Sequence, residues 1–119
     1  MNLKLTIYAD RFCRKAEREA EAEAFDLSTG ICEDVLNIIN IDMFDGGLEA
    51  LSSDSGQKLM IDVIKNGYPF FKELVKDLFD LDDEEVKRTK IADVAKVIID
   101  IVKYSVTQLA NSLGGSSKN

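Results

Sequence analysis

The residues best suited to chemistry form an acidic run, Asp80-Leu81-Asp82-Asp83-Glu84-Glu85. Hard cations such as Ca²⁺ need several carboxylates that converge from alternate positions. A calcium-binding loop also needs a glycine at its sixth position and a glutamate at its twelfth, where this chain has Glu85 and Ile91. The spacing does not favour a metal site, and we expect these carboxylates to stabilise the start of a helix.

Few other residues offer nucleophilic, metal or phosphate chemistry. The chain has no histidine, which excludes Cys-His and Ser-His pairs and most zinc sites. We expect Cys13 and Cys32 to be reduced thiols, with one disulfide as the alternative. The segment Asp45-Gly46-Gly47 lacks the lysine of a phosphate-binding loop, so we expect a turn there. The residues therefore predict a protein that is not an enzyme and binds no cofactor or metal.

Composition limits the class of protein further. A chain of 119 residues, 45% hydrophobic and 31% charged, is typical of one soluble globular domain. Its 22 acidic and 15 basic residues give a net charge of -7, which argues against nucleic-acid binding. No apolar run reaches the roughly 18 to 20 residues that span a bilayer. The strand-like start is unlike a secretory signal, so we expect no membrane partner and a cytoplasmic location.

The N-terminal pattern predicts a β-hairpin. Leu3, Leu5 and Ile7 alternate with polar residues, which places them on one face of a strand. Residues 16–24 also alternate, but they are good helix formers, so pattern and propensity disagree. In a helix, Glu17 would face Glu21 and repel it. We favour a second strand paired around residues 10–15, with a helix as the alternative.

The rest of the chain predicts helices. We expect them over about residues 31–40, from about 55 to a cap at Gly67, over about 69–80 with Pro69 in the first turn, and from a Thr89 cap to about 113. Residues 48–51 and 82–88 are expected to form short turns, the second opened by a capping box of Asp82 and Glu85. The expected fold is mainly α, a compact bundle of about four to five helices with a short N-terminal β-hairpin. It comprises a single domain over 1–113, with a hairpin in 1–25 and helices in 28–113, and a flexible polar tail at 114–119.

Two apolar clusters are candidates for partner binding, although core packing is the simpler interpretation of both. Tyr68, Phe70 and Phe71 are close in sequence, and neighbours on a helix point 100° apart, so all three cannot share one face. The last helix is apolar over a wide arc, which indicates either a central position or contact with another subunit. We therefore expect self-association, with these candidate partner-binding residues: Tyr68, Phe70, Phe71, Ile98 and Val102.

As a whole, the chain resembles the tail assembly chaperones of long-tailed (siphovirus-type) phages and prophages of Gram-positive bacteria. The resemblance covers about residues 1–113 and rests on packing and capping patterns, not on a catalytic signature. These are Leu3-Lys4-Leu5-Thr6-Ile7-Tyr8, Phe25-Asp26-Leu27-Ser28-Thr29-Gly30-Ile31-Cys32-Glu33-Asp34-Val35-Leu36, Phe70-Phe71-Lys72-Glu73-Leu74 and Asp83-Glu84-Glu85-Val86-Lys87-Arg88-Thr89-Lys90.

The resemblance implies a non-enzymatic protein that binds the tape measure protein, keeps it soluble and helps recruit tail tube protein around it. It also implies self-association, a place in the host bacterial cytoplasm and absence from the mature virion. Many such proteins have a longer form made by ribosomal frameshifting, and Ser117-Lys118-Asn119 is compatible with a slippery codon run. The alternative is a small acidic adaptor or inhibitor that binds a basic protein partner.

Overall fold

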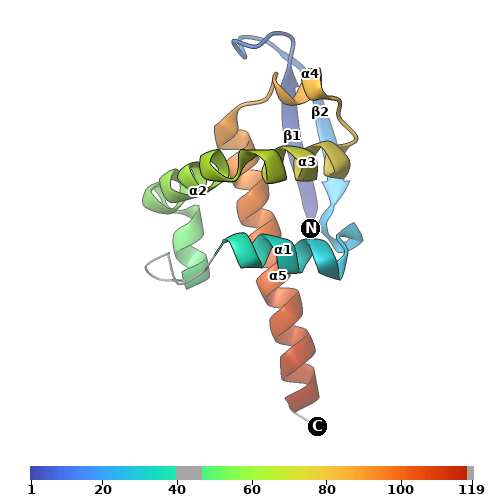
Figure 1. The fold of residues 1–119 in the computed structure, drawn as a ribbon, viewed down its shortest axis with the longest axis vertical. Helices are drawn as coiled ribbons and strands as arrows, with labels where there is room; N and C mark the ends of the chain where they lie inside the picture. The colour runs from blue at the N-terminus through green and yellow to red at the C-terminus, as the bar shows by residue number, and fades with distance from the viewer. Residues whose placement is uncertain (40–46, 118–119) are drawn as a thin grey trace.

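The computed structural model describes residues 1–39 and 47–117, with side chains for 1–39 and 49–108. Within these residues it confirms a mainly helical fold with a short N-terminal hairpin (Figure 1). The elements are β1 (Asn2–Tyr8), β2 (Ala16–Glu23), the 3-10 helix η1 (Ala24–Asp26), α1 (Thr29–Ile38), the 3-10 helix η3 (Gly47–Ser52), α2 (Asp54–Asn66), α3 (Tyr68–Phe79), α4 (Asp83–Val86) and α5 (Ile91–Ser117).

Residues 16–23 form a strand, which decides between the two interpretations of this segment. β2 pairs antiparallel with β1, and Leu5 faces Ala20 across the ladder. The ladder contains an irregularity, because Ile7 pairs with Arg18 while Tyr8 pairs with Ala16. The apolar residues of β1 are buried, as their alternation predicts: Leu3, Leu5 and Ile7.

The centre of the molecule is helix α5. Its 27 residues extend over about 40 Å at the helical rise. The helix contacts α1, α2, η3 and β1, and in Figure 1 it runs behind α1 and the α2–α3 pair. Its buried side chains include Ala95, Ile98, Ile101 and Val102. This helix therefore holds the hairpin and the other helices together.

Side chains at the helix ends explain where most helices begin. The Ser28 hydroxyl accepts a hydrogen bond from the Ile31 amide at 3.2 Å, and the Ser53 hydroxyl accepts one from the Gly56 amide at 3.0 Å. Each hydroxyl satisfies an amide that the helix itself leaves unpaired. Gly67 ends α2 and precedes α3, as the sequence predicts.

Two expected boundaries of the last helix were wrong. Thr89 does not cap α5, because its hydroxyl donates a hydrogen bond to the Val86 carbonyl at 2.7 Å. The Lys90 carbonyl accepts the first bonds of the helix instead. The helix also continues past Leu113 to Ser117, since glycine lowers helix stability without forbidding a helix. The flexibility of residues 114–119 stays a prediction, and the expected turn at Asp45-Gly46 lies outside the described residues.

Candidate partner-binding surface

Three of the five candidate residues lie in the core. Phe71, Ile98 and Val102 are each 0% exposed, so a partner cannot contact them while this fold is intact. Over residues 91–108, whose side chains are described, much of the apolar arc of α5 is covered by the chain's own elements, and Val97 and Ile99 are buried as well. This described part of the arc therefore gives no support to a contact with another subunit.

The other two candidates lie nearer the surface. Tyr68, the first residue of α3, is 41% exposed, and Phe70 is half-buried. The rings of Phe70 and Phe71 meet edge to face, with 5.1 Å between centroids and 80° between planes. Because Phe71 points inward, its neighbour Phe70 must lie at the margin of the core. Tyr68 and Phe70 thus stay predicted partner-binding residues.

Tyr68 lies at the edge of a small pocket of about 110 Å³ between α3 and the start of α5, which we call the Tyr68 pocket. Exposed Ile91 also lines it, and its polar lining comes from Lys72, Lys87 and Thr89. Its remaining lining is apolar: Ile64, Phe71, Val75, Val86 and Val94. An apolar cavity of about 150 Å³ holds one benzene molecule, so this pocket fits one aliphatic side chain and is too small for a cofactor.

The acidic run fastens α4 to its surroundings. Asp82 and Glu85 form the predicted capping box, with the Glu85 amide donating to Asp82 at 2.8 Å and the Asp82 amide donating to Glu85 at 3.2 Å. Asp83 lies 2.7 Å from the Lys76 ammonium and 3.3 Å from that of Lys72. These hydrogen bonds hold the pKa of Asp83 below its ordinary value and raise that of Lys76. Among the described residues no group of three possible metal ligands converges.

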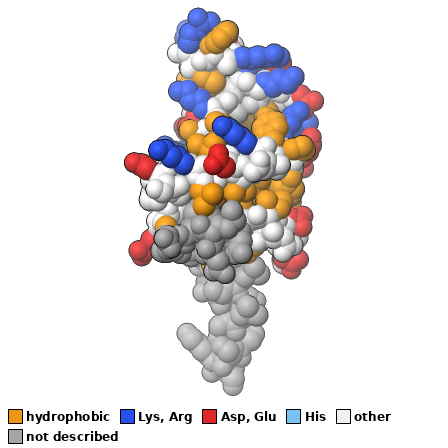
Figure 2. All heavy atoms as spheres, turned by 60° about the vertical axis from the view of Figure 1, so that its left-hand side comes forward, with side chains coloured by type: hydrophobic (Ala, Val, Ile, Leu, Met, Phe, Trp, Pro, Cys, Tyr) orange, Lys and Arg blue, Asp and Glu red, His pale blue; other side chains and the backbone are white. Residues whose placement is uncertain are grey.

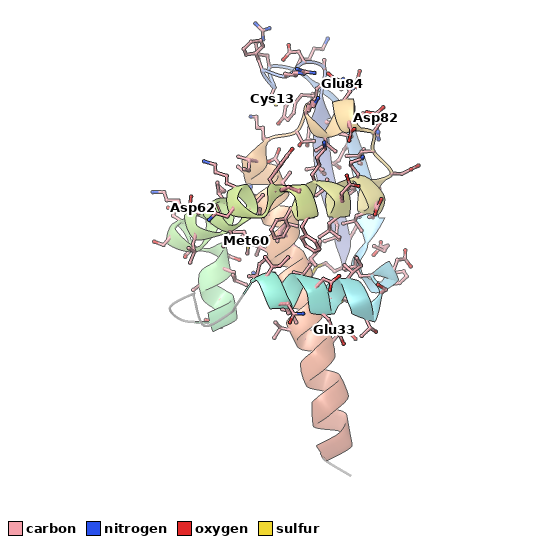
Figure 3. All side chains as sticks on the ribbon, viewed as in Figure 1. Cys13, Glu33, Met60, Asp62, Asp82 and Glu84 are labelled. Carbon is pink, nitrogen blue, oxygen red and sulfur yellow. The ribbon has the colours of Figure 1, made fainter. Side chains whose placement is uncertain are left out.

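The remaining carboxylates of α4 bind the hairpin. Arg11 donates two hydrogen bonds to Glu84, at 3.2 and 2.8 Å, and Arg18 donates one to Glu85. These bonds lower the pKa values of Glu84 and Glu85. In Figure 3, Glu84 and Asp82 lie at the same end of the molecule as Cys13 in the hairpin turn. The acidic run is therefore a structural clamp between two elements far apart in sequence.

The hairpin turn carries a surface feature that sequence reasoning missed. Phe12 is 80% exposed, and the Arg14 guanidinium lies 5.0 Å from its ring centroid. The sequence does contain a signal for this surface feature, an aromatic residue between basic residues in the predicted turn: Arg11-Phe12-Cys13-Arg14-Lys15. Cys13 and Cys32 are free.

A second missed feature is a groove of about 360 Å³ between α1 and α3, which we call the α1–α3 groove. Its apolar lining consists of Leu27, Ile31, Leu74 and Leu78. Its polar lining consists of Asp26, Ser28 and Asp77, and both aspartates are exposed. In Figure 1 the start of α1 and the end of α3 lie on the same side of the molecule. Sequence periodicity could not find this groove, because it depends on how two helices are placed side by side.

No protein-family model, curated protein or solved structure matches the chain. Within the part of the chain that the structure describes, no helix is long and apolar enough to cross a membrane.

Proposed function

We propose that this protein is a non-enzymatic phage tail assembly chaperone that binds the tape measure protein. In this role it keeps the tape measure soluble and helps to recruit tail tube protein. It acts in the host bacterial cytoplasm and is absent from the mature virion. The observation that carries the proposal is a set of apolar side chains at the surface of an acidic chain, Tyr68 and Ile91 beside the Tyr68 pocket.

The form of this surface supports protein binding. An aromatic side chain next to a pocket that fits one aliphatic side chain is typical of interface anchors. A helix of the tape measure protein would insert one apolar residue there and lay its apolar face along Tyr68 and Ile91. Lys87 of the pocket, which has no described ion pair, favours a carboxylate on the helix next to that residue.

Two observations support a role without catalysis. The sequence has no histidine, and the carboxylates of the acidic run form ion pairs that connect parts of the fold. The carboxylates of α4 are taken up by a capping box and by ion pairs, so they are not available as a general acid or base. The two thiols have no histidine to activate them.

Co-expression with the tape measure protein encoded nearby tests the proposal. The long partner should be insoluble alone and soluble with many copies of this chain bound, as measured by pull-down and size-exclusion light scattering. Tyr68→Asp should weaken the complex about tenfold or more, the cost of losing one anchor residue. Ile38→Asp is the matched control, because Ile38 is 39% exposed on α1 and lies outside the pocket.

The second candidate function is an acidic adaptor that binds a basic protein. The α1–α3 groove favours it, since Asp26 and Asp77 flank an apolar floor. If the chain neither binds nor solubilises the tape measure protein, the chaperone proposal fails and the adaptor becomes the leading one. Equal loss of binding in Tyr68→Asp and Ile38→Asp would remove the Tyr68 pocket from the proposal.

A further inference from the structure

The hairpin tip, residues 10–15, presents an aromatic ring among cations. Phe12 is the most exposed large apolar side chain among the described residues, at 80%. Arg11, Arg14 and Lys15 surround it in sequence, and Figure 2 shows Lys and Arg side chains gathered at this end of the molecule. Aromatic residues and arginine are the residue types most enriched in interface anchors.

The hairpin tip is held in one shape. The Phe12 amide donates to the Asp10 carboxylate at 2.9 Å, and the Ala9 amide donates to the Lys15 carbonyl at 2.8 Å. Cys13 adopts a left-handed conformation with φ of 54°, which few non-glycine residues adopt. A side chain that is already positioned loses less conformational freedom on binding. Phe12 is therefore suited to insertion into an apolar pocket.

The α1–α3 groove has the complementary chemistry. Its volume of about 360 Å³ exceeds the roughly 150 Å³ that accommodates benzene, whereas the Tyr68 pocket at 110 Å³ does not reach it. Asp26 and Asp77 have no described cation within 4.0 Å, and Lys15 of the hairpin tip has no described carboxylate within that distance. Arg11 and Arg14 of the tip are already paired, with Glu84 and Asp10. An apolar floor flanked by two carboxylates fits an aromatic ring that lies near the Lys15 ammonium in sequence.

We propose that the hairpin tip of one copy of this chain docks into the α1–α3 groove of a second copy. One chain cannot close this contact on itself, since the seven residues of β1 separate the two surfaces by about 20 Å. The contact joins two different surfaces, so a row of copies keeps a free tip at one end and a free groove at the other. Repeated head to tail, this contact builds open chains or rings of copies.

This contact deepens the proposed function, because a row of copies can bind along a long partner. Its role in tail assembly rests on that proposed function. Its test needs only this chain, so a failed co-expression experiment leaves the result of this test unaffected. A tip in a groove buries less surface than a stable dimer does, and association should be weak and concentration-dependent. It should also weaken with added salt, since the charged groups are exposed.

Sedimentation velocity from micromolar to millimolar chain, under reducing conditions that prevent a Cys13 disulfide, tests the contact. Wild type should grow beyond a dimer. Phe12→Ser and Asp77→Lys should each weaken association about tenfold or more. Both variants should fold, since Phe12 is exposed and a lysine near the end of α3 suits the helix dipole. An equimolar mixture of the two should form dimers and stop there, because only one intact tip and one intact groove remain.

Two further variants separate the groove from general charge effects. Asp62→Lys makes the same charge change on α2, away from the groove (Figure 3), and should associate like wild type. The chain has no tryptophan, so Phe12→Trp places a single reporter at the tip. Its emission should shift to shorter wavelength as the chain is concentrated, and the shift should vanish when Asp77→Lys is added.

Four results would overturn the contact. They are a wild type that stays monomeric at millimolar concentration, Phe12→Ser assembling like wild type, a mixture of the two variants that forms no dimer, and Asp62→Lys weakening assembly as much as Asp77→Lys. The last would show that net charge alone governs association.

Discussion

Burial separates two aromatic residues of the same helix into two roles. Phe71 and Tyr68 are three positions apart on α3, yet one is fully buried and the other 41% exposed. A charge is costly only where water cannot reach it. The same substitution should therefore cost much more free energy of unfolding at Phe71 than at Tyr68.

Phe71→Asp should abolish the cooperative fold, with a loss of more than about 4 kcal/mol, because it removes a core ring and buries a carboxylate. Tyr68→Asp should change the free energy of unfolding by less than about 1 kcal/mol. Urea unfolding followed by circular dichroism measures both. A folded Phe71→Asp variant would show that this position is not part of the core.

At the scale of elements, α2 begins in very close contact with η3. A Cβ atom on Gly56 would lie 2.0 Å from the Ala50 carbonyl oxygen. Gly30, in the first turn of α1, has no such neighbour, since the nearest atom to its Cβ position is the Ser28 hydroxyl at 3.8 Å. Both glycines are in first turns, so the pair isolates the effect of packing.

Gly56→Ala should destabilise the protein by about 1 to 3 kcal/mol, because backbone must move to accept the methyl group. Gly30→Ala should stabilise it by about 0.5 to 1 kcal/mol, as alanine favours a helix. Thermal unfolding of the two variants checks the signs. If Gly56→Ala stabilised the protein, η3 would be able to move and accept the methyl group with little loss of free energy.

The elements were more predictable from sequence than the surface. The alternation of Leu3, Leu5 and Ile7 and the capping box of Asp82 and Glu85 are local signals, and both were confirmed. Periodicity places Ile98 on the apolar face of its helix, but it does not show whether the same chain or a partner covers that face. That depends on the placement of α5 among the other elements, which no local pattern encodes. The α1–α3 groove and the exposure of Phe12 were missed for the same reason.

At the scale of the whole molecule, α4 joins the hairpin to α3 through ion pairs of Asp83, Glu84 and Glu85. Each of these carboxyls has a lowered pKa in the fold. A lowered pKa means that the charged form is favoured by folding, so the stabilisation is complete above the unfolded pKa. It is lost as the pH falls through the folded pKa.

The free energy of unfolding should therefore decline as the pH falls below about 4.5, the ordinary pKa of glutamate. A variant with Asp83→Asn, Glu84→Gln and Glu85→Gln should show a flatter decline. A control with Glu33→Gln, Asp34→Asn and Asp62→Asn removes three exposed carboxyls without a described ion pair, and should keep the wild-type slope. Urea unfolding at pH 7 and pH 3.5 compares the three proteins. If all three proteins lost the same free energy of unfolding between pH 7 and pH 3.5, the ion pairs of α4 would not act as a clamp.

The hairpin has one more consequence, for the fate of the protein at high concentration. Each of its two strands has an outer edge without a strand neighbour among the described residues, and open edges invite strands of other molecules to add. The glutamates of β2 that made its conformation ambiguous in the sequence place carboxylates along that strand, with Lys4 near Glu19 and Glu21. Mutual repulsion of these charges opposes fibril growth at neutral pH, so this short strand carries its own protection against amyloid.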